Sequence, residues 1–191
     1  MTTRITTLIR RSTRSIPRLA LLGSLVATPS LFAADPPREH GSPAKLVQIV
    51  REATRPFIDV GAATAAGYGQ FLGCVSGPDH GAMGVHYVNG ALVGDGAIDA
   101  TKPEALIYEF SHGRARLVGV EFIVDAATWL ASHGSAPVLE GQSFQLVGSP
   151  NRYGIPAPFF ELHVWAWRDN PNGAFVDWND RVTCEGEQPE G

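Results

Sequence analysis

The segment 159–168 alternates between two kinds of side chain, and this alternation constrains the fold more than any other feature of the chain. In an extended strand, successive side chains point to opposite faces. One face would carry only apolar residues, namely Phe160, Leu162, Val164 and Ala166. The other face would carry Glu161, His163, Trp165 and Trp167. We therefore predict a strand over 159–168 whose first face packs on a hydrophobic core and whose second face forms the wall of a pocket.

Helical patterns come before strand patterns along the chain, and this order indicates the fold class. Ser42 and Pro43 are typical of a helix start, and apolar residues then recur at helical spacing up to Ala53. Further helical turns are predicted over 57–66 and 126–132. Strands are predicted over 68–75, 83–88, 105–110, 116–124 and 143–147. Because helices come first and short-linked strands follow, we predict a single α+β domain over 43–191 with a mainly antiparallel sheet.

The first 33 residues carry five arginines and no acidic residue. An apolar run over 19–27 follows the last arginine, and small residues follow it up to Ala34. These are the three parts of a secretory signal peptide, and the run is much shorter than the roughly 20 residues that cross a bilayer. We predict a signal peptide over 1–33 and a polar, proline-rich linker over 34–42. The protein would be secreted or periplasmic, without membrane insertion after cleavage.

Removal of the predicted signal peptide leaves a strongly acidic chain. Residues 34–191 hold ten Lys and Arg against 19 Asp and Glu, which gives a formal net charge of −9. Such a surface repels the phosphates of nucleic acids and of anionic membranes. We therefore expect no nucleic-acid partner, and a small molecule or a metal ion is the expected ligand.

Both cysteines, Cys74 and Cys184, lie in the part of the chain that would be exported. In an oxidising compartment an isolated pair most simply forms a disulfide. Their spacing excludes a CxxC redox or zinc motif, while two free thiols or a shared metal ion are the alternatives. A Cys74–Cys184 disulfide would close a loop of about 110 residues, for which loop entropy gives a stabilisation of about 4–5 kcal/mol.

Four ionisable residues interrupt the predicted strands. His86 lies within 83–88, Glu109 and Glu121 lie in a predicted hairpin over 105–124, and His163 shares a strand face with Trp165. A charged side chain in an apolar strand needs a partner, a ligand or solvent, because burying it alone is costly. We predict that these five residues form a ligand-binding face. His86, His163 and Glu121 would be the ligands of a zinc, manganese or iron ion, since imidazole and carboxylate donors suit these metals.

The same residues have alternative roles that their dispersed spacing leaves open. The histidines are alternatively framework residues that hydrogen bond to a carboxylate or a carbonyl. The glutamates alternatively lie on a solvated strand face or in salt bridges with arginines. Asp177, Asn179 and Asp180 are interpreted as turn and cap residues, because their spacing does not match an EF-hand calcium loop.

Several short motifs resemble those of a group of uncharacterised exported bacterial proteins. They are HYVN at 86–89, PEALIYE at 103–109, LVGVE at 117–121 and ELHVW at 161–165, with Asn170-Pro171-Asn172-Gly173 after them. The resemblance extends over roughly residues 50–184. It implies a single-domain exported protein and assigns no activity.

The sequence favours an exported protein that binds a small ligand or a divalent metal ion on a polar, aromatic face of the sheet. A hydrolase or lyase that uses the same His and Glu residues as acid, base or metal ligands is the second hypothesis. A cell-envelope protein-interaction module is the third. A pure binding protein turns over no substrate, and an interaction module exposes an apolar patch instead of enclosing a pocket.

Overall fold

Three short helical segments open the part of the chain that is described by the computed structural model, which covers residues 44–77 and 79–186. They are α1 (Lys45–Ala53), the 3-10 helix η1 (Arg55–Ile58) and α2 (Val60–Ala65). Leu46, Val47 and Val50 of α1 are buried, so the helix has the apolar face that its spacing predicts. The predicted signal peptide, linker and helix start at Ser42 and Pro43 lie outside the described residues.

Six strands form an antiparallel sheet in the order β1-β2-β3-β4-β8-β7. Their bounds are β1 (Gly69–Ser76), β2 (Ala82–Val88), β3 (Ala105–Ser111), β4 (Arg114–Asp125), β7 (Gln145–Val147) and β8 (Phe159–Val164). The smaller elements are α3 (Gly90–Val93), α4 (Ala126–Ser132) and the two-stranded pair β5 (Val138–Leu139) and β6 (Gln142–Ser143). The predicted α+β class, with helices before a mainly antiparallel sheet in one domain, is confirmed.

The hairpin of β3 and β4 is the central pairing of this sheet. Ser111 pairs with Arg114, so the loop has two residues, His112 and Gly113. Both adopt positive φ angles, of 51° and 70°. This is the geometry of the tight hairpin turns whose twist matches that of the flanking strands. The polar turn thus sets the pairing of these two central strands next to the loop.

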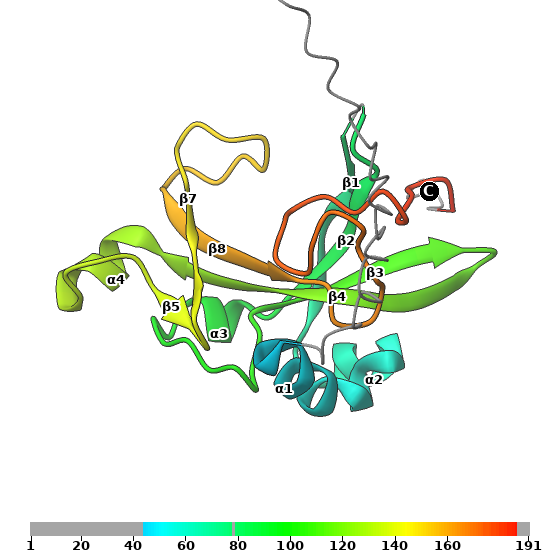
Figure 1. Cartoon of the computed structure of the whole chain (residues 1–191), viewed down its shortest axis with the longest axis horizontal. Helices are drawn as coiled ribbons and strands as arrows, with labels where there is room; N and C mark the ends of the chain where they lie inside the picture. Colours follow the sequence, from blue (N-terminus) through cyan, green and yellow to red (C-terminus); the bar gives the residue numbers. More distant parts are fainter. Residues whose placement is uncertain (1–43, 78, 187–191) are drawn as a thin grey trace, which may run out of the picture. The chain divides into compact units, whose positions relative to one another are not determined.

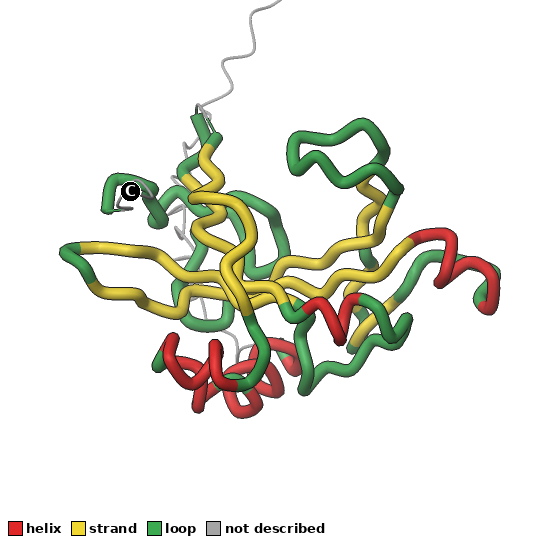
Figure 2. Tube along the Cα trace, turned by 180° about the vertical axis from the view of Figure 1, so that it is seen from behind, coloured by secondary structure: helices red, strands yellow, loops and turns green. Residues whose placement is uncertain are grey.

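The two faces of the sheet are covered by different parts of the chain. Figure 1 shows α1 and α2 on one side of the sheet and the orange-to-red C-terminal segment on the other, and Figure 2 shows the same layers from behind. The main core lies between the helices and the sheet. A smaller apolar cluster, Ala82, Ile107, Val118, Trp165 and Val182, lies under the C-terminal segment.

The predicted strand over 159–168 is too long, because β8 ends at Val164. From there the chain leaves the ladder. Trp165 N donates to Ala174 O, while the N–H groups of Trp167 and Arg168 both donate to Val118 O, at 3.0 Å each. Because two consecutive residues share one acceptor, side chains no longer alternate between the two faces of the sheet from this point. Trp167 therefore packs with the main core on the helix side, and its Nε1 donates to Thr54 Oγ1 at 3.0 Å.

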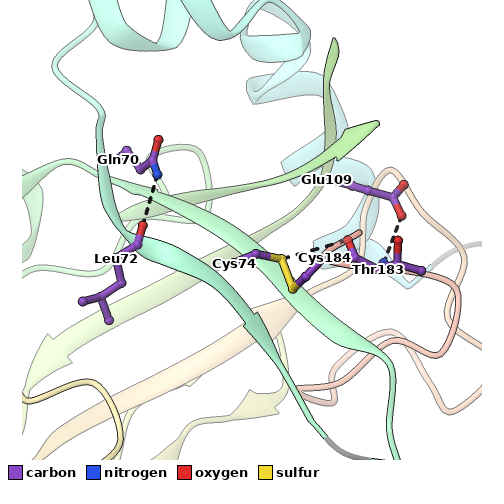
Figure 3. The surroundings of a disulfide bond; sticks show 6 residues. All are labelled: Gln70, Leu72, Cys74, Glu109, Thr183 and Cys184. Carbon is purple, nitrogen blue, oxygen red and sulfur yellow. Dashed lines mark hydrogen bonds between the residues drawn. A yellow bond between two sulfur atoms is a disulfide. The ribbon is translucent and has the colours of Figure 1, made fainter. Parts of the chain in front are cut away.

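The predicted disulfide between Cys74 and Cys184 is confirmed and joins β1 to the C-terminal segment (Figure 3). The two Cα atoms are 5.5 Å apart, and the bond spans a sequence separation of 110. A short bridge supports it, since Ala82 and Asn179 exchange backbone hydrogen bonds of 3.2 and 3.3 Å. The C-terminal segment is therefore held across the sheet near the start of β2.

We expect the double substitution Cys74→Ser and Cys184→Ser to lower the free energy of unfolding by about 3–5 kcal/mol, because it restores the entropy of a long loop to the unfolded chain. Urea unfolding followed by circular dichroism measures this loss. Reduction of the native protein should reproduce it, and the same reductant should leave the double variant unchanged. Equal stabilities of the oxidised protein and the variant would contradict the prediction.

Glu104 is buried just before β3, at 2% exposure. Its Oε2 accepts a hydrogen bond of 2.9 Å from Ile123 N on β4. Burial is the main cause that raises its pKa, to about 8, and the hydrogen bond from Ile123 opposes the rise. The folded protein therefore holds a proton that the unfolded chain loses near pH 4.5. The stability that this proton supports is complete below that pH and falls as the pH rises toward 8.

We expect Glu104→Gln to raise the free energy of unfolding by about 3–4 kcal/mol at pH 7, since pH 7 lies about 2.5 units above the usual pKa and each unit corresponds to about 1.4 kcal/mol. The amide oxygen keeps the acceptor for Ile123 and carries no charge. Urea unfolding from pH 4 to pH 8 gives the measurement and its internal control. The two proteins should be equally stable at pH 4 and should diverge as the pH rises. Parallel pH profiles would rule out a proton held at Glu104.

Candidate metal centre

Three strands bring His86, Glu121 and His163 together on the face of the sheet opposite the helices. Glu121 on β4 is the direct ladder neighbour of His163 on β8. His86 comes from β2, and its Nε2 lies 3.3 Å from Glu121 Oε2. One donor atom of each of the three residues lies within 4.8 Å of the other two. The residues predicted as metal ligands are therefore adjacent in space, although the two histidines are 77 positions apart in the sequence.

Curvature of the sheet makes this meeting possible. Strands β3 and β4 lie between β2 and β8. In a flat sheet the backbones of β2 and β8 would be about 14 Å apart, at three strand spacings. The two imidazole rings are edge to face with centroids 5.8 Å apart. The sheet therefore curls around this face, and side chains from distant strands converge on it.

A second group of polar residues surrounds His163 on its other side. His163 Nδ1 lies 3.6 Å from Asp177 Oδ1, and Glu161 completes a set whose donor atoms all lie within 4.8 Å. Gln145 on β7 donates to Glu161 Oε1 at 2.8 Å and also to Asp177 Oδ1. Asp177 comes from the C-terminal segment. The amide of Gln145 thus holds the two carboxylates beside the imidazole.

The four strand residues of the cluster are almost completely buried. His86, Glu121, Glu161 and His163 are exposed by 6%, 5%, 2% and 1%. Among the described residues, both ring nitrogens of His163 are buried without a hydrogen-bond partner. Each such orphan group costs about 1–3 kcal/mol relative to hydration. The cluster is therefore a polar site in which the nitrogens of His163 are left available in a low-dielectric environment.

Burial also sets the protonation of the cluster. Burial is the largest cause that lowers the pKa of His86 to about 3, and the nearby His163 is the next. Burial also lowers the pKa of His163 to about 3. Burial and then the neighbouring Glu161 raise the pKa of Glu121 well above its usual range. Burial likewise raises the pKa of Glu161 and of Asp177. At neutral pH both imidazoles are therefore neutral, which is the form that binds a metal ion.

A cavity of about 270 Å³ lies directly beside His86 and Glu121. Apart from these two residues its lining is apolar or aromatic: Phe71, Leu72, Val75, Val88, Val93, Ile123, Tyr153, Ile155 and Phe159. The residues come from β1, β2, β4 and β8, from α3 and from the loop that precedes β8. A largely apolar pocket with a few convergent polar groups is the usual form of a small-molecule site.

The other two predicted site residues lie outside the three-residue group. Glu109 Oε1 accepts a hydrogen bond of 3.1 Å from Thr183 N, beside the disulfide (Figure 3). Trp165 is next to His163, with nearly parallel rings 6.4 Å apart, and its Nε1 donates to Val176 O at 2.6 Å. Trp165 therefore supports His163 from the side of the smaller core and does not line the cavity described above.

The sequence predicts Glu161 on the pocket wall but not among the five ligand-binding residues, and it assigns no site role to Gln145, Asp177 or Tyr153. Alternation puts Glu161 on the same face as His163, and this is sufficient to include it. Asp177 is interpreted from the sequence as a turn residue, since nothing local shows that the C-terminal segment crosses β8. Gln145 and Tyr153 carry no sequence signal, because their positions depend on the pairing of β7 with β8 and on the loop before β8.

Comparison of the chain with models of protein families, with curated proteins and with solved structures finds no match. Within residues 44–77 and 79–186, no helix has the length and apolar character that crossing a membrane requires. The fold and the site define the molecule as a curled antiparallel α+β domain with a disulfide and a buried His/Glu/Asp cluster that is a possible metal site.

Proposed function

We propose that this is an exported protein that holds a divalent transition-metal ion through His86, Glu121 and His163. The observation that carries the proposal is the buried His163 ring, whose nitrogens have no hydrogen-bond partner among the described residues. A framework histidine normally has its ring nitrogens paired. A metal ion bound to Nε2 would satisfy one of them. The disulfide fits the same proposal, since such bonds persist in the periplasm and outside the cell.

Distances within the group support a metal ion of the zinc type. In a tetrahedral site with bonds of 2.0–2.1 Å, neighbouring ligand atoms are about 3.3–3.4 Å apart. His86 Nε2 and Glu121 Oε2 are already separated by 3.3 Å. Two imidazoles and one carboxylate suit zinc, and they also suit iron(II) and manganese.

Asp177 fits the role of an outer carboxylate. A histidine that binds a metal through one nitrogen usually donates from the other nitrogen to a carboxylate, which fixes the ring. His163 Nδ1 faces Asp177 Oδ1 at 3.6 Å, which leaves Nε2 for the ion. Gln145 in turn orients Asp177. The surroundings of His163 therefore offer both a nitrogen for the metal ion and a carboxylate that fixes the orientation of the ring.

Hydrolysis at the same centre is a second candidate function, and the cavity beside the ligands favours it. Three protein ligands leave a position for water or substrate, as in catalytic zinc sites. His86 and Glu121 line the cavity, so a molecule in the cavity would meet that position. A screen of the metal-loaded protein against ester, glycoside and peptide substrates separates the two functions, because a binding protein turns none of them over.

We expect one zinc, iron or manganese ion per chain when the full chain is purified from periplasm or medium without chelators or a His-tag. Elemental analysis gives the stoichiometry, and zinc titration of the chelated protein gives the affinity. The double variant His86→Ala and His163→Ala should lose the ion. Glu121→Gln, which keeps the side-chain volume, should weaken zinc binding by about 100-fold or more, beyond the range for outer-shell changes.

Glu109→Gln is the matched control for this experiment, because Glu109 is a buried strand glutamate that lies beside the disulfide instead of the cluster. It should leave zinc affinity unchanged, and circular dichroism verifies the folding of each variant. A folded native protein that takes up none of the three metals would refute the proposal. So would equal zinc affinity in the native protein and the double variant.

We expect Asp177→Asn to weaken zinc binding by about 10–100-fold, since a neutral amide oxygen is a weaker acceptor than a carboxylate for the N–H group of His163. Asp180→Asn is the control, because Asp180 bonds to Asn172 on the exposed surface, at 3.0 Å. Competition against a chromophoric chelator measures both affinities. Equal effects of the two substitutions would show that Asp177 acts only through general charge.

A further inference from the structure

The cavity beside the candidate metal centre has an apolar body and one polar wall. His86 and Glu121 supply that wall, and the rest of the lining is hydrocarbon apart from the phenol of Tyr153. Tyr153 Oη is engaged with Met83 Sδ at 3.5 Å. An occupant of this space would therefore bury an apolar body and present its polar atom to His86 and Glu121. The volume of 270 Å³ corresponds to about ten non-hydrogen atoms, since an engineered 150 Å³ cavity takes up benzene.

The charged groups around the polar wall bear on whether the polar group of a ligand is anionic or uncharged. Glu121, Glu161 and Asp177 supply three carboxyl groups around His163. No lysine or arginine is among the described residues that line the cavity, so an anionic group there would meet carboxyl groups and no cationic side chain. An anionic ligand would add a further negative charge to this low-dielectric site, whereas an uncharged ligand would not.

The outer end of the cavity also suits an apolar molecule. Phe71 and Leu72 of β1 line it and are exposed by 40% and 47%, although both are apolar. Leu72 has a φ of 60°, a conformation that non-glycine residues rarely adopt, at the irregularity between Phe71 and Val75 in the pairing of β1 with β2. This irregularity lies where β1 borders the cavity. A bound apolar molecule would cover side chains that otherwise face water.

We propose that the cavity binds an uncharged, mainly apolar small molecule with one oxygen donor, such as a ketone or an alcohol, whose oxygen completes the coordination of the metal ion. The proposal rests on the proposed metal site for the partner of the oxygen. It adds the chemical class of the ligand.

Isothermal titration of the zinc-loaded full chain with 2-octanone tests this class, with octanoate as the charged counterpart. We expect one 2-octanone per chain and at least tenfold weaker binding of octanoate. Chelation of the zinc should weaken 2-octanone binding at least tenfold. Val75→Trp fills the cavity from β1 and should also weaken it at least tenfold without changing zinc affinity. Val93→Trp should do the same from α3, in case the first variant fails to fold.

Val138→Trp is the matched control, because Val138 is an apolar residue exposed by 63% that does not line the cavity. It should leave both affinities unchanged. A zinc-loaded protein that does not bind 2-octanone would overturn this inference and leave the metal site standing. Octanoate binding as tight as that of 2-octanone would overturn the uncharged class. A chain that takes up no zinc and yet binds 2-octanone would overturn both the metal site and the coordination of the oxygen.

Discussion

Strand β8 is buried along its whole length on both faces, although only one of the two faces is apolar. Phe160, Leu162 and Val164 pack on the helix side as part of the main core. Glu161 and His163 point to the other side, where burial of polar groups is costly without partners. The other polar residues of the site supply the neighbours that these two buried groups need. They are His86, Glu121, Gln145 and Asp177, and all of them lie next to this face.

The C-terminal segment covers the polar face of β8, and the disulfide holds that segment in place. Cys184 is held to β1, and Asn179 pairs with Ala82 at the start of β2. Between β8 and these two attachments, the segment passes over the sheet and delivers Asp177 to His163. Trp165 packs beneath the same segment and contacts His163 from the side. The disulfide therefore stabilises the fold and also closes the site from one side.

Local patterns in the sequence predict most of the elements, and long-range geometry accounts for what they miss. Alternation finds β8 and the face of His163, and the polar turn at 111–114 finds the hairpin. The end of β8 at Val164 depends on two N–H groups that share Val118 O, which no local pattern reveals. The meeting of His86 with His163 depends on curvature over four strands. Glu109 is a residue that the same local reasoning assigns to the site but that lies outside it. Its position in a strand resembles that of Glu121, yet its carboxylate accepts a hydrogen bond from Thr183 N.

Stability alone does not explain the composition of the cluster. Apolar residues of similar volume at buried ionic positions are often neutral or stabilising, whereas a buried polar group without a partner is destabilising. A framework role would be served by a histidine with both nitrogens paired, as the hydroxyls of Tyr68 and Tyr108 are paired with backbone carbonyls in the main core. His163 is buried more deeply than His86 and has no such bond. Departures of this kind from local consistency are typical of functional sites. The orphan imidazole, the converging carboxylates and the adjoining cavity therefore all fit the binding site that we propose.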